Sequence, residues 1–266
     1  MKIAFIGGGN MGESMLSAVL EKGLVKPEAI VVSDVAKARL KYLEEKYGVA
    51  AASSNREAAE KADVVVLAIK PQNLAEVMSE LKGRLKPTQL VLSIIAGART
   101  KTLSQGLKHN CIVRVMPNTP AQVGEGISVW TATAEVTEQQ KESARAILRA
   151  MGKEIYVDEE DYIDMATAVS GSGPAYFFLV IESLVDAAVG IGLPREMAQE
   201  LVVQTMLGSG HFIQKSGKEP AELRRMVTSP GGTTAEALLY LEKGRFSQLI
   251  IEAVRAAYNK AKKLGG

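Results

Sequence analysis

Short apolar runs alternate with helix-like segments along the first part of the chain. We expect strands at residues 2–6, 29–32, 64–69, 90–95, 111–115, 126–130 and 154–157, and those at 2–6 and 64–69 to be buried. Residues 11–23, between the first two strands, carry apolar side chains at helical spacing and end at Gly23. Residues 36–47, after the second strand, are a second expected helix, which ends at Gly48. Strands that alternate with helices predict a mostly parallel, doubly wound α/β sheet.

The pattern changes after a charged break at residues 158–161. No strand pattern follows this break, and we expect only helices, at 161–169, from 174, at 194–215, from 233 and at 246–264. The sequence therefore predicts two domains. The first is an α/β domain over residues 1–158, and the second is an all-α domain over residues 159–266.

The segment from Val169 to Pro194 contains the most apolar helix of the chain. It opens with SGSGP, and two glycines with Pro174 predict a sharp helix start. Residues 175–181 are all apolar, and Glu182 is the first charge after them. A helix that is apolar nearly all round is buried on more than one side, and this stretch is too short to span a bilayer. We therefore expect a core helix.

Composition narrows the class of protein. The 266 residues carry a net charge of +2, and the basic side chains are scattered among the acids. This argues for a small-molecule partner and against nucleic acid or a membrane surface. Cys111 is the single cysteine, which excludes an intrachain disulfide and suits a reducing compartment. Met1 and Lys2 lead directly into the first strand, so we expect a cytoplasmic protein without a signal peptide.

A glycine motif joins the first strand to the first helix. It reads GGGNMG over residues 7–12, which is G-x-G-x-x-G at the turn of a βαβ unit. Gly7 would allow the tight turn, Gly9 the approach of a pyrophosphate, and Gly12 close packing of the helix. This context favours dinucleotide binding in a Rossmann-type sheet. The alternative is a glycine-rich turn without a ligand.

The residues at the end of the second strand do not decide between NAD and NADP as the cofactor. Asp34 stands where an acid commonly binds the ribose 2′-hydroxyl of NAD. Ser33, Lys37 and Arg39 lie nearby and could receive the 2′-phosphate of NADP instead. A further alternative is that Asp34 only starts a turn or caps the next helix. Asn55 is expected to cap a short alanine-rich turn.

Further strands end in residues that suit a ligand cleft, because ligands bind beyond the carboxyl ends of parallel strands. Lys70 and Pro71 follow the strand at 64–69, with Ala68 small enough to lie against a cofactor. Lys70 offers a cation to a phosphate or ribose, although it could equally be a solvated strand-end lysine. Ala96 and Asn118 follow the next two strands.

Two sites match the capping-box pattern of a helix start. Thr137 with Gln140 is the first, and Thr233 with Glu236 is the second. Before the second box, two glycines at 231–232 let a ligand approach the backbone, and the free N–H groups of the helix start could bind a carboxylate. The alternative is an ordinary capped helix without a ligand.

Motifs spread in order along nearly the whole chain carry a family resemblance. Besides GGGNMG, they are AIKPQ (68–72), SIIAG (93–97), RVMPNTP (114–120), SGSGPAYFF (170–178) and SPGGTTAEAL (229–238). The last two are specific, whereas the glycine motif fits many dehydrogenases. On these motifs the chain resembles the pyrroline-5-carboxylate reductases, which catalyse the last step of proline biosynthesis.

The resemblance implies a site that binds NADPH or NADH in the first domain and a helical second domain that forms a dimer. With the strand-end argument, we expect the cofactor to be bound by Ile6, Gly7, Gly8, Gly9, Asn10, Met11, Gly12, Ser33, Asp34, Asn55, Ala68, Ile69, Lys70, Pro71, Ile95, Ala96, Gly97 and Asn118. We expect the substrate at Ser229, Gly231, Gly232, Thr233 and Thr234. Asp34 stands where the family often has serine, threonine or arginine.

The implied reaction is reduction of the cyclic imine 1-pyrroline-5-carboxylate to L-proline. A protonated imine accepts a hydride readily, so positioning is the main task of the enzyme. This fits a chain whose only histidines are His109 and His211 and in which we find no acid–base dyad or metal site. If Thr233 caps its helix, the Thr234 hydroxyl is free to hydrogen-bond the ring nitrogen, and we predict it to be catalytic.

Two other functions compete with this one. A β-hydroxyacid dehydrogenase shares the architecture but needs a lysine on the long helix, and the helix after Pro174 carries only Glu182 and Asp186 as charges. A protein that binds NAD(P) without turnover is the second, and the intact SPGGTT loop argues against it. The apolar run at 175–181 and the apolar face of 246–264 predict an obligate homodimer, and the family implies larger rings of dimers.

Overall fold

The computed structural model describes residues 1–265 and divides into two compact units. One unit comprises Met1–Ser172 together with the chain from Ala257 onward, and the other comprises Gly173–Ala256. This division follows contacts between residues, which group the segment 159–172 with the sheet. The predicted boundary between residues 158 and 159 concerns folding domains and stays a prediction.

An eight-stranded sheet forms the centre of the first unit, in the order β3-β2-β1-β4-β5-β6-β7-β8. Its strands are β1 (Ile3–Ile6), β2 (Ile30–Ser33), β3 (Ala50–Ala51), β4 (Val64–Leu67), β5 (Leu90–Ser93), β6 (Ile112–Met116), β7 (Gly126–Ala132) and β8 (Gly152–Tyr156). Each neighbouring pair is parallel except β6 and β7. The predicted doubly wound sheet is confirmed, and β3 is an addition to it.

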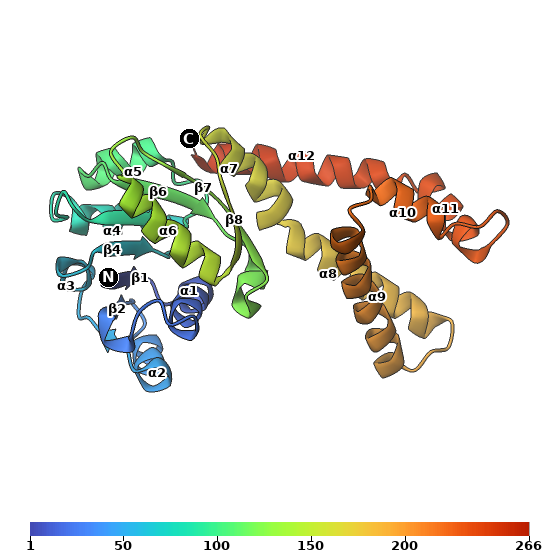
Figure 1. The fold of residues 1–266 in the computed structure, drawn as a ribbon, viewed down its shortest axis with the longest axis horizontal. Helices are drawn as coiled ribbons and strands as arrows, with labels where there is room; N and C mark the ends of the chain where they lie inside the picture. The colour runs from blue at the N-terminus through green and yellow to red at the C-terminus, as the bar shows by residue number, and fades with distance from the viewer. Residues whose placement is uncertain (266) are drawn as a thin grey trace. The chain divides into compact units, whose positions relative to one another are not determined.

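Helices cover both faces of the sheet, as Figure 1 shows. On one face, apolar side chains of the sheet form a core with α1 (Asn10–Glu21), α2 (Lys37–Tyr47) and α6 (Glu138–Ala150). The opposite face packs against α3 (Asn55–Glu60), α4 (Leu74–Leu81) and α5 (Thr100–Leu107). Because β1 and β4 are adjacent, the chain changes direction across the sheet between them, which opens a crevice at their carboxyl ends.

Short helices complete the connections of the first unit. They are the 3-10 turns η1 (Pro27–Ala29), η2 (Pro71–Asn73) and η3 (Thr119–Val123), then α7 (Asp161–Ala166) and the π-helical turn η4 (Thr167–Gly171). The capping box predicted at Thr137 and Gln140 is confirmed at the start of α6.

The helix start predicted at SGSGP is found, since α8 (Gly173–Gly190) begins at Gly173 and Pro174 is its second residue. The start is not sharp, because η4 and Ser172, which has helical φ and ψ, join α7 directly to α8. Pro174 has no N–H to donate to the preceding turn, and a π-helical turn accommodates this defect. The Ser172 N–H donates to the Thr167 carbonyl at 2.8 Å, and the Ser170 hydroxyl donates to the Ala166 carbonyl at 3.0 Å. These bonds supply donors where the regular ladder is interrupted.

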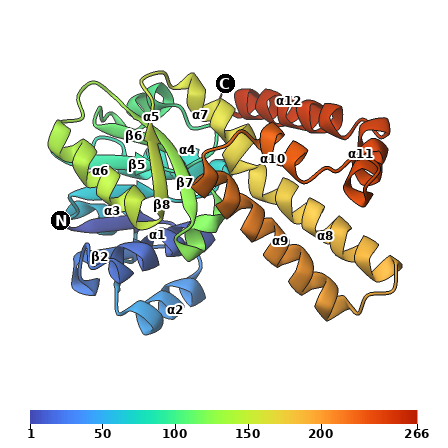
Figure 2. The same ribbon diagram turned by 45° about the vertical axis from the view of Figure 1, so that its right-hand side comes forward.

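The second unit is entirely helical. It contains α8, α9 (Arg195–Ser216), α10 (Pro220–Met226), α11 (Thr233–Lys243) and the first part of α12 (Phe246–Gly265). Helices α8 and α9 pack side by side, as Figure 2 shows. Few residues of this unit are buried within the single chain.

The expectation of a core helix is wrong for α8 in the single chain. Phe177, Phe178 and Leu179 are 59%, 62% and 62% exposed, and the helix buries only Gly173 and Val185. By length and composition, the helical run 161–190 could also cross a membrane, and 22% of its apolar window is buried. An apolar face of this size on a helical pair is typical of a surface that another protein or a membrane covers.

Candidate functional site

The glycine turn lies at the crevice between β1 and β4. A cavity of about 280 Å³ opens beside it, at the carboxyl ends of β1, β2 and β4. Eight of the residues predicted to bind the cofactor line this cavity: Gly7, Gly9, Ser33, Asp34, Asn55, Ala68, Ile69 and Lys70. The topology of the sheet thus brings together four segments that are far apart in the sequence.

The three motif glycines have different physical roles. Gly7 has a φ of +99°, and a side chain there would collide with the Ala68 carbonyl. A side chain on Gly12 would collide with the Gly7 carbonyl, so Gly12 permits close packing of α1 against the turn. No heavy atom lies within 4 Å of the position that a Gly9 side chain would take. Gly9 is therefore not needed for the fold, and the open space in front of it suits a pyrophosphate.

The start of α1 faces the same turn. Gly9 is its N-cap and gives it no side-chain cap, so the N–H groups of Asn10, Met11 and Gly12 begin the helix without one. Uncapped N–H groups and the positive end of the helix dipole attract phosphate oxygens. Ile6 is fully buried in β1 and can offer a cofactor only its backbone.

Ser33 and Asn55 meet across the cavity. The Ser33 hydroxyl donates to Asn55 Oδ1 at 2.6 Å, and Asn55 Nδ2 donates to Glu80 Oε2 at 2.7 Å. Asn55 is not the cap of α3, as the sequence had suggested. Ser54 caps the helix by accepting from the Glu57 N–H, which leaves the Asn55 side chain directed to the cavity residues.

Asp34 and Arg39 are turned to the glycine turn. The carboxylate of Asp34 accepts the Gly8 N–H at 2.8 Å and the Ala36 N–H at 2.8 Å, so it does start a turn. Arg39 donates to the Gly8 carbonyl and forms an ion pair with Glu13. Neither arrangement is visible in the sequence, because both depend on how α2 packs on α1.

Two cations line a neighbouring cavity of about 630 Å³ that shares Ser33, Asp34 and Asn55 with the first. They are Lys37 and Arg56. The sequence analysis named Lys37 and missed Arg56, which only the fold brings to this place. Neither forms an ion pair with another residue of the described part of the chain.

The loop after β5 carries three more predicted cofactor residues. Ile95 is buried, and Ala96 and Gly97 beside it are half-buried. Gly97 has a φ of +78°, and a side chain there would collide with the backbone of Leu264. This glycine lets the end of the chain pack against the loop. Pro71 is the first residue of η2, which follows β4, and both Pro71 and Lys70 are exposed.

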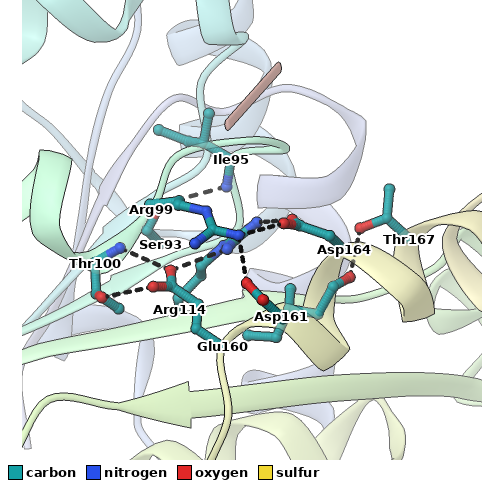
Figure 3. A network of polar contacts seen from close by, with 10 residues as sticks. Ser93, Ile95, Arg99, Thr100, Arg114, Glu160, Asp161, Asp164 and Thr167 are labelled. Atoms are coloured by element: carbon teal, nitrogen blue, oxygen red, sulfur yellow. Dashed lines mark hydrogen bonds and ion pairs between the residues drawn. The ribbon is translucent and has the colours of Figure 1, made fainter. Parts of the chain in front are cut away.

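A buried polar network holds the loop after β5 against α7, as Figure 3 shows. Arg114 of β6 contacts Glu160 at 2.9 Å and Asp164 at 2.6 Å, and its side chain is only 1% exposed. Arg99 reaches Asp164 at 3.0 Å, and Thr100 donates its N–H to Glu160 at 2.8 Å. Buried charges are tolerated when they are paired and hydrogen-bonded in this way. The network thus fixes the loop that contains Ile95, Ala96 and Gly97.

Asn118 supports the backbone of β7. Its side-chain oxygen accepts the Ile127 N–H at 2.9 Å, and the residue is 9% exposed. It does not line the cavity beside the glycine turn. Its predicted contact with a cofactor stays a prediction.

The predicted substrate loop lies in the second unit, between α10 and α11. Gly231 has a φ of +69°, and the Gly232 N–H donates to the Ser229 carbonyl at 3.0 Å, which closes a turn. The capping box predicted at Thr233 and Glu236 is wrong. Gly232 is the N-cap of α11, and Thr233 is its first helical residue. The helix start therefore has no side-chain cap, and its N–H groups are open to an anion.

The threonine hydroxyls of this loop are equivalent in one respect. Within residues 1–265, neither Thr233 nor Thr234 forms a side-chain hydrogen bond, although Thr233 is exposed and Thr234 is half-buried. Capping therefore does not occupy the Thr233 hydroxyl. Only the loop motif distinguishes Thr234 from Thr233 as the candidate catalytic residue.

The remaining nucleophile and base candidates are structural. His109 is buried, with 6% of it exposed, and its Nε2 lies 2.7 Å from the Gln89 carbonyl. Burial raises the pKa of the Cys111 thiol, which disfavours the thiolate that a nucleophile requires. No group of metal ligands occurs among the described residues. The features of the site that the structure does show, a cavity beside an uncapped helix start, suit the binding and orientation of a ligand.

Comparisons with known proteins identify the family. A family model described as pyrroline-5-carboxylate reductase dimerisation matches residues 160–264, and one described as NADP oxidoreductase coenzyme F420-dependent matches residues 2–97. The pyrroline-5-carboxylate reductase of Synechocystis sp. is 42% identical over 265 residues, covering 100% of this chain and 98% of the relative.

Solved structures agree with the sequence relatives. A pyrroline-5-carboxylate reductase from Coxiella burnetii superposes with a TM-score of 0.90 at 41% identity, covering 100% of this chain and 98% of the other. The Plasmodium falciparum pyrroline carboxylate reductase, solved with NADP bound, gives 0.92 at 35% identity with the same coverage. Full-length identity at this level, the sheet with its glycine turn and the matched dimerisation region agree. The chain belongs to the pyrroline-5-carboxylate reductases, a family of NAD(P)H-dependent oxidoreductases.

Proposed function

We propose that this chain reduces the cyclic imine 1-pyrroline-5-carboxylate to L-proline with NADPH or NADH, as the last step of proline biosynthesis. The observation that carries the proposal is the glycine turn at the end of β1. Its fold requires Gly7 and Gly12 but leaves open space at Gly9, beside a cavity lined by eight predicted cofactor residues. Full-length relatives that are named for this reaction support the choice of substrate.

The cofactor supplies the hydride when it is bound. The N–H groups at the start of α1 are placed to hold its phosphates, and Ser33 with Asn55 offers polar atoms to a ribose. The loop Ile95–Gly97, fixed by the network around Arg114, supports the proposed cofactor site at the end of β5. These residues orient the reductant, which is the main catalytic demand when the acceptor is an activated imine.

The Ser229–Thr234 loop is the proposed substrate site. The uncapped N–H groups of α11 suit the substrate carboxylate, and the turn at Gly231 and Gly232 lets the backbone come close to it. The Thr234 hydroxyl would hydrogen-bond the ring nitrogen, which accepts a proton when the imine becomes an amine. Thr233, Gly231, Gly232 and Ser229 would shape this site.

The dimerisation region accounts for the exposed apolar helices. The matched region, 160–264, includes α8 and α9, whose outward faces are apolar. We propose that two copies of the chain cover these faces in a homodimer and that dimers assemble into larger rings. On this reading α8 needs no membrane, and nothing in the charge pattern suits nucleic acid. We place the enzyme in the cytoplasm, where a protein with one free thiol is stable.

The direct test is an assay of the purified chain with 1-pyrroline-5-carboxylate and NADPH, following NADPH oxidation and L-proline formation together. Equal amounts of both products would support the proposal. Tight NADPH binding without turnover would instead identify a sensor of NAD(P). Oxidation of a β-hydroxyacid with no activity toward the imine would identify the dehydrogenase alternative.

The variant Gly9→Val ties the activity to the glycine turn. The space around Gly9 is open, so the variant should fold with an unchanged circular dichroism spectrum. A valine would occupy the volume of the pyrophosphate, so binding of NADPH and NADH should be lost. Retained affinity in the folded variant would place the cofactor elsewhere. Gly12→Val is the contrasting control, because its side chain collides with the turn and should impair folding itself.

A further inference from the structure

The side chain of Arg39 is committed to the glycine turn. Arg39 follows the start of α2, where a cation commonly faces the 2′-phosphate of NADP. Here its Nε donates to the Gly8 carbonyl, and its terminal nitrogen pairs with Glu13 of α1. The guanidinium also lies 4.9 Å from the centre of the Tyr42 ring. Each of these contacts restricts the orientation of Arg39.

Glu13 is the anchor of this arrangement. It accepts hydrogen bonds from Tyr47 at 2.8 Å, from Lys46 at 3.0 Å and from Tyr42 at 3.1 Å, besides the ion pair with Arg39. Its side chain is 16% exposed, so water screens these contacts only in part. The charge of Arg39 is thus neutralised within the protein, on the α1–α2 side of the turn.

The Gly8 peptide groups are held by two side chains of opposite charge. Asp34 accepts the Gly8 N–H at 2.8 Å, and Arg39 donates to the Gly8 carbonyl. In a planar trans peptide, the C=O of one residue and the N–H of the next point in opposite directions. Drawing the Gly8 carbonyl toward α2 therefore directs the Gly9 N–H away from α2. Gly9 is the residue with open space in front of it and lines the cavity beside the turn.

We propose that Arg39 is a positioning residue that holds the glycine turn in its phosphate-accepting orientation, with Glu13 fixing Arg39 and Asp34 holding the other side of Gly8. It binds no part of the cofactor itself. The cations left for a 2′-phosphate are Lys37 and Arg56 in the neighbouring cavity and Lys70 beside the glycine turn, none of which forms an ion pair in the described part of the chain. This inference rests on the proposed cofactor use and assigns different tasks to Arg39 and Lys37.

The test compares two cofactors on the same variants. Fluorescence titration of purified full-length protein gives Kd for NADPH and for NADH in wild type, Arg39→Gln, Glu13→Gln and Lys37→Gln. NADH lacks the 2′-phosphate, so only a residue that contacts this phosphate changes the ratio of the two affinities. If Arg39 positions the turn, Arg39→Gln weakens both cofactors by a similar factor, about tenfold, and leaves the ratio unchanged.

The variant Glu13→Gln is a second, independent way to distinguish positioning of the glycine turn by Arg39 from direct binding of the 2′-phosphate by Arg39. In the positioning role, loss of the anchor loosens Arg39, and both cofactors bind more weakly. If Arg39 bound the 2′-phosphate, loss of the neighbouring negative charge would strengthen NADPH selectively. Lys37→Gln is the matched control, because Lys37 is a cation two residues before Arg39 in α2, and its loss should weaken NADPH and spare NADH.

The contradicting results are equally specific. A loss confined to NADPH in Arg39→Gln would make Arg39 a phosphate ligand, and unchanged affinities in both Arg39→Gln and Glu13→Gln would remove it from the site. Should Arg39→Gln fail to fold, by circular dichroism, the Glu13→Gln titration decides alone. Failure of the wild type to bind either cofactor would refute the proposed function instead.

Discussion

At the scale of single residues, the sharpest claim concerns Thr234. Its hydroxyl has no partner within residues 1–265, and the residue is half-buried at the start of α11. Thr234→Ala should keep the fold, because alanine is a good helix former. Loss of a hydrogen bond to a partly charged ring nitrogen should cost about 1.5–3 kcal/mol, or roughly ten- to a hundredfold in kcat/KM. Steady-state kinetics measure this, and Thr234→Ser should recover most of it.

The neighbouring threonine provides the control for this prediction. Thr233 is the first residue of α11 and is exposed, so Thr233→Ala should retain most of the activity. If Thr233→Ala is the damaging change in a folded protein, the two roles are exchanged. If Thr234→Ala is as fast as wild type, Thr234 has no catalytic role.

Residue types at strand ends were predictable from the sequence, whereas their hydrogen-bond partners were not. Asp34 and Arg39 were recognised as candidates for the ribose and the 2′-phosphate because of their distance from the glycines. Both side chains contact Gly8, a partner that the sequence did not indicate. Long and flexible side chains choose partners from elements that only the fold brings together, as Arg56 and Glu80 also illustrate.

At the scale of elements, α1 and α2 are joined through Glu13, and this contact depends on pH. Partial burial raises the pKa of Glu13, but hydrogen bonds from Tyr47, Lys46, Arg39 and Tyr42 outweigh it and lower the pKa from 4.5 to about 2. A depressed pKa in the folded state means that the ionised form stabilises the fold above pH 4.5. This contribution is lost as the pH falls from 4.5 through 2.

Glu13→Gln removes the charge and keeps the size of the side chain. At neutral pH the variant should be less stable than wild type by about 1–3 kcal/mol in urea unfolding. The difference in unfolding free energy between wild type and variant should shrink as the pH falls below 4.5. Wild-type Glu13 then becomes protonated and loses its charge, whereas the glutamine of the variant is uncharged at every pH. A difference that stays constant between neutral pH and pH 3 would show that the charge of Glu13 does not hold α1 to α2.

The two capping-box predictions show what a local pattern can and cannot establish. At Thr137 the box forms, with the Thr137 hydroxyl accepting the Gln140 N–H and the Gln140 side chain accepting the Thr137 N–H. At Thr233 the same pattern fails, because the turn closed between Ser229 and Gly232 places Gly232 at the N-cap. Buried strands were predicted because apolar runs are strong signals. The elements β3, α4, α5 and α10 were missed because each has eight residues or fewer, and elements this short depend on packing rather than on local sequence.

At the scale of the whole molecule, the apolar pattern of α8 predicts a helix that is buried. The pattern does not say whether the same chain or a partner covers it. Hydrophobicity predicts burial without naming the partner, and within one chain Phe178 and Leu179 remain 62% exposed. The match of residues 160–264 to a dimerisation family supplies what the pattern lacked. The mostly parallel sheet, in contrast, is covered by helices of the same chain, and the sequence was sufficient to predict this sheet.

A substitution in α8 should therefore prevent dimerisation without changing the structure of the glycine turn. Leu179→Glu places a charge in a face that a partner copy would desolvate, which costs several kcal/mol in an interface. We expect the wild type to sediment as a dimer or a multiple of it, and Leu179→Glu to sediment as a monomer. Val123→Glu is the control, since Val123 is 76% exposed and lies outside the matched dimerisation region. The monomeric variant should keep NADPH affinity, because every residue that holds the glycine turn belongs to the first unit. An active wild-type monomer at micromolar concentration, or Leu179→Glu that still sediments as wild type does, would show that α8 is not the assembly surface.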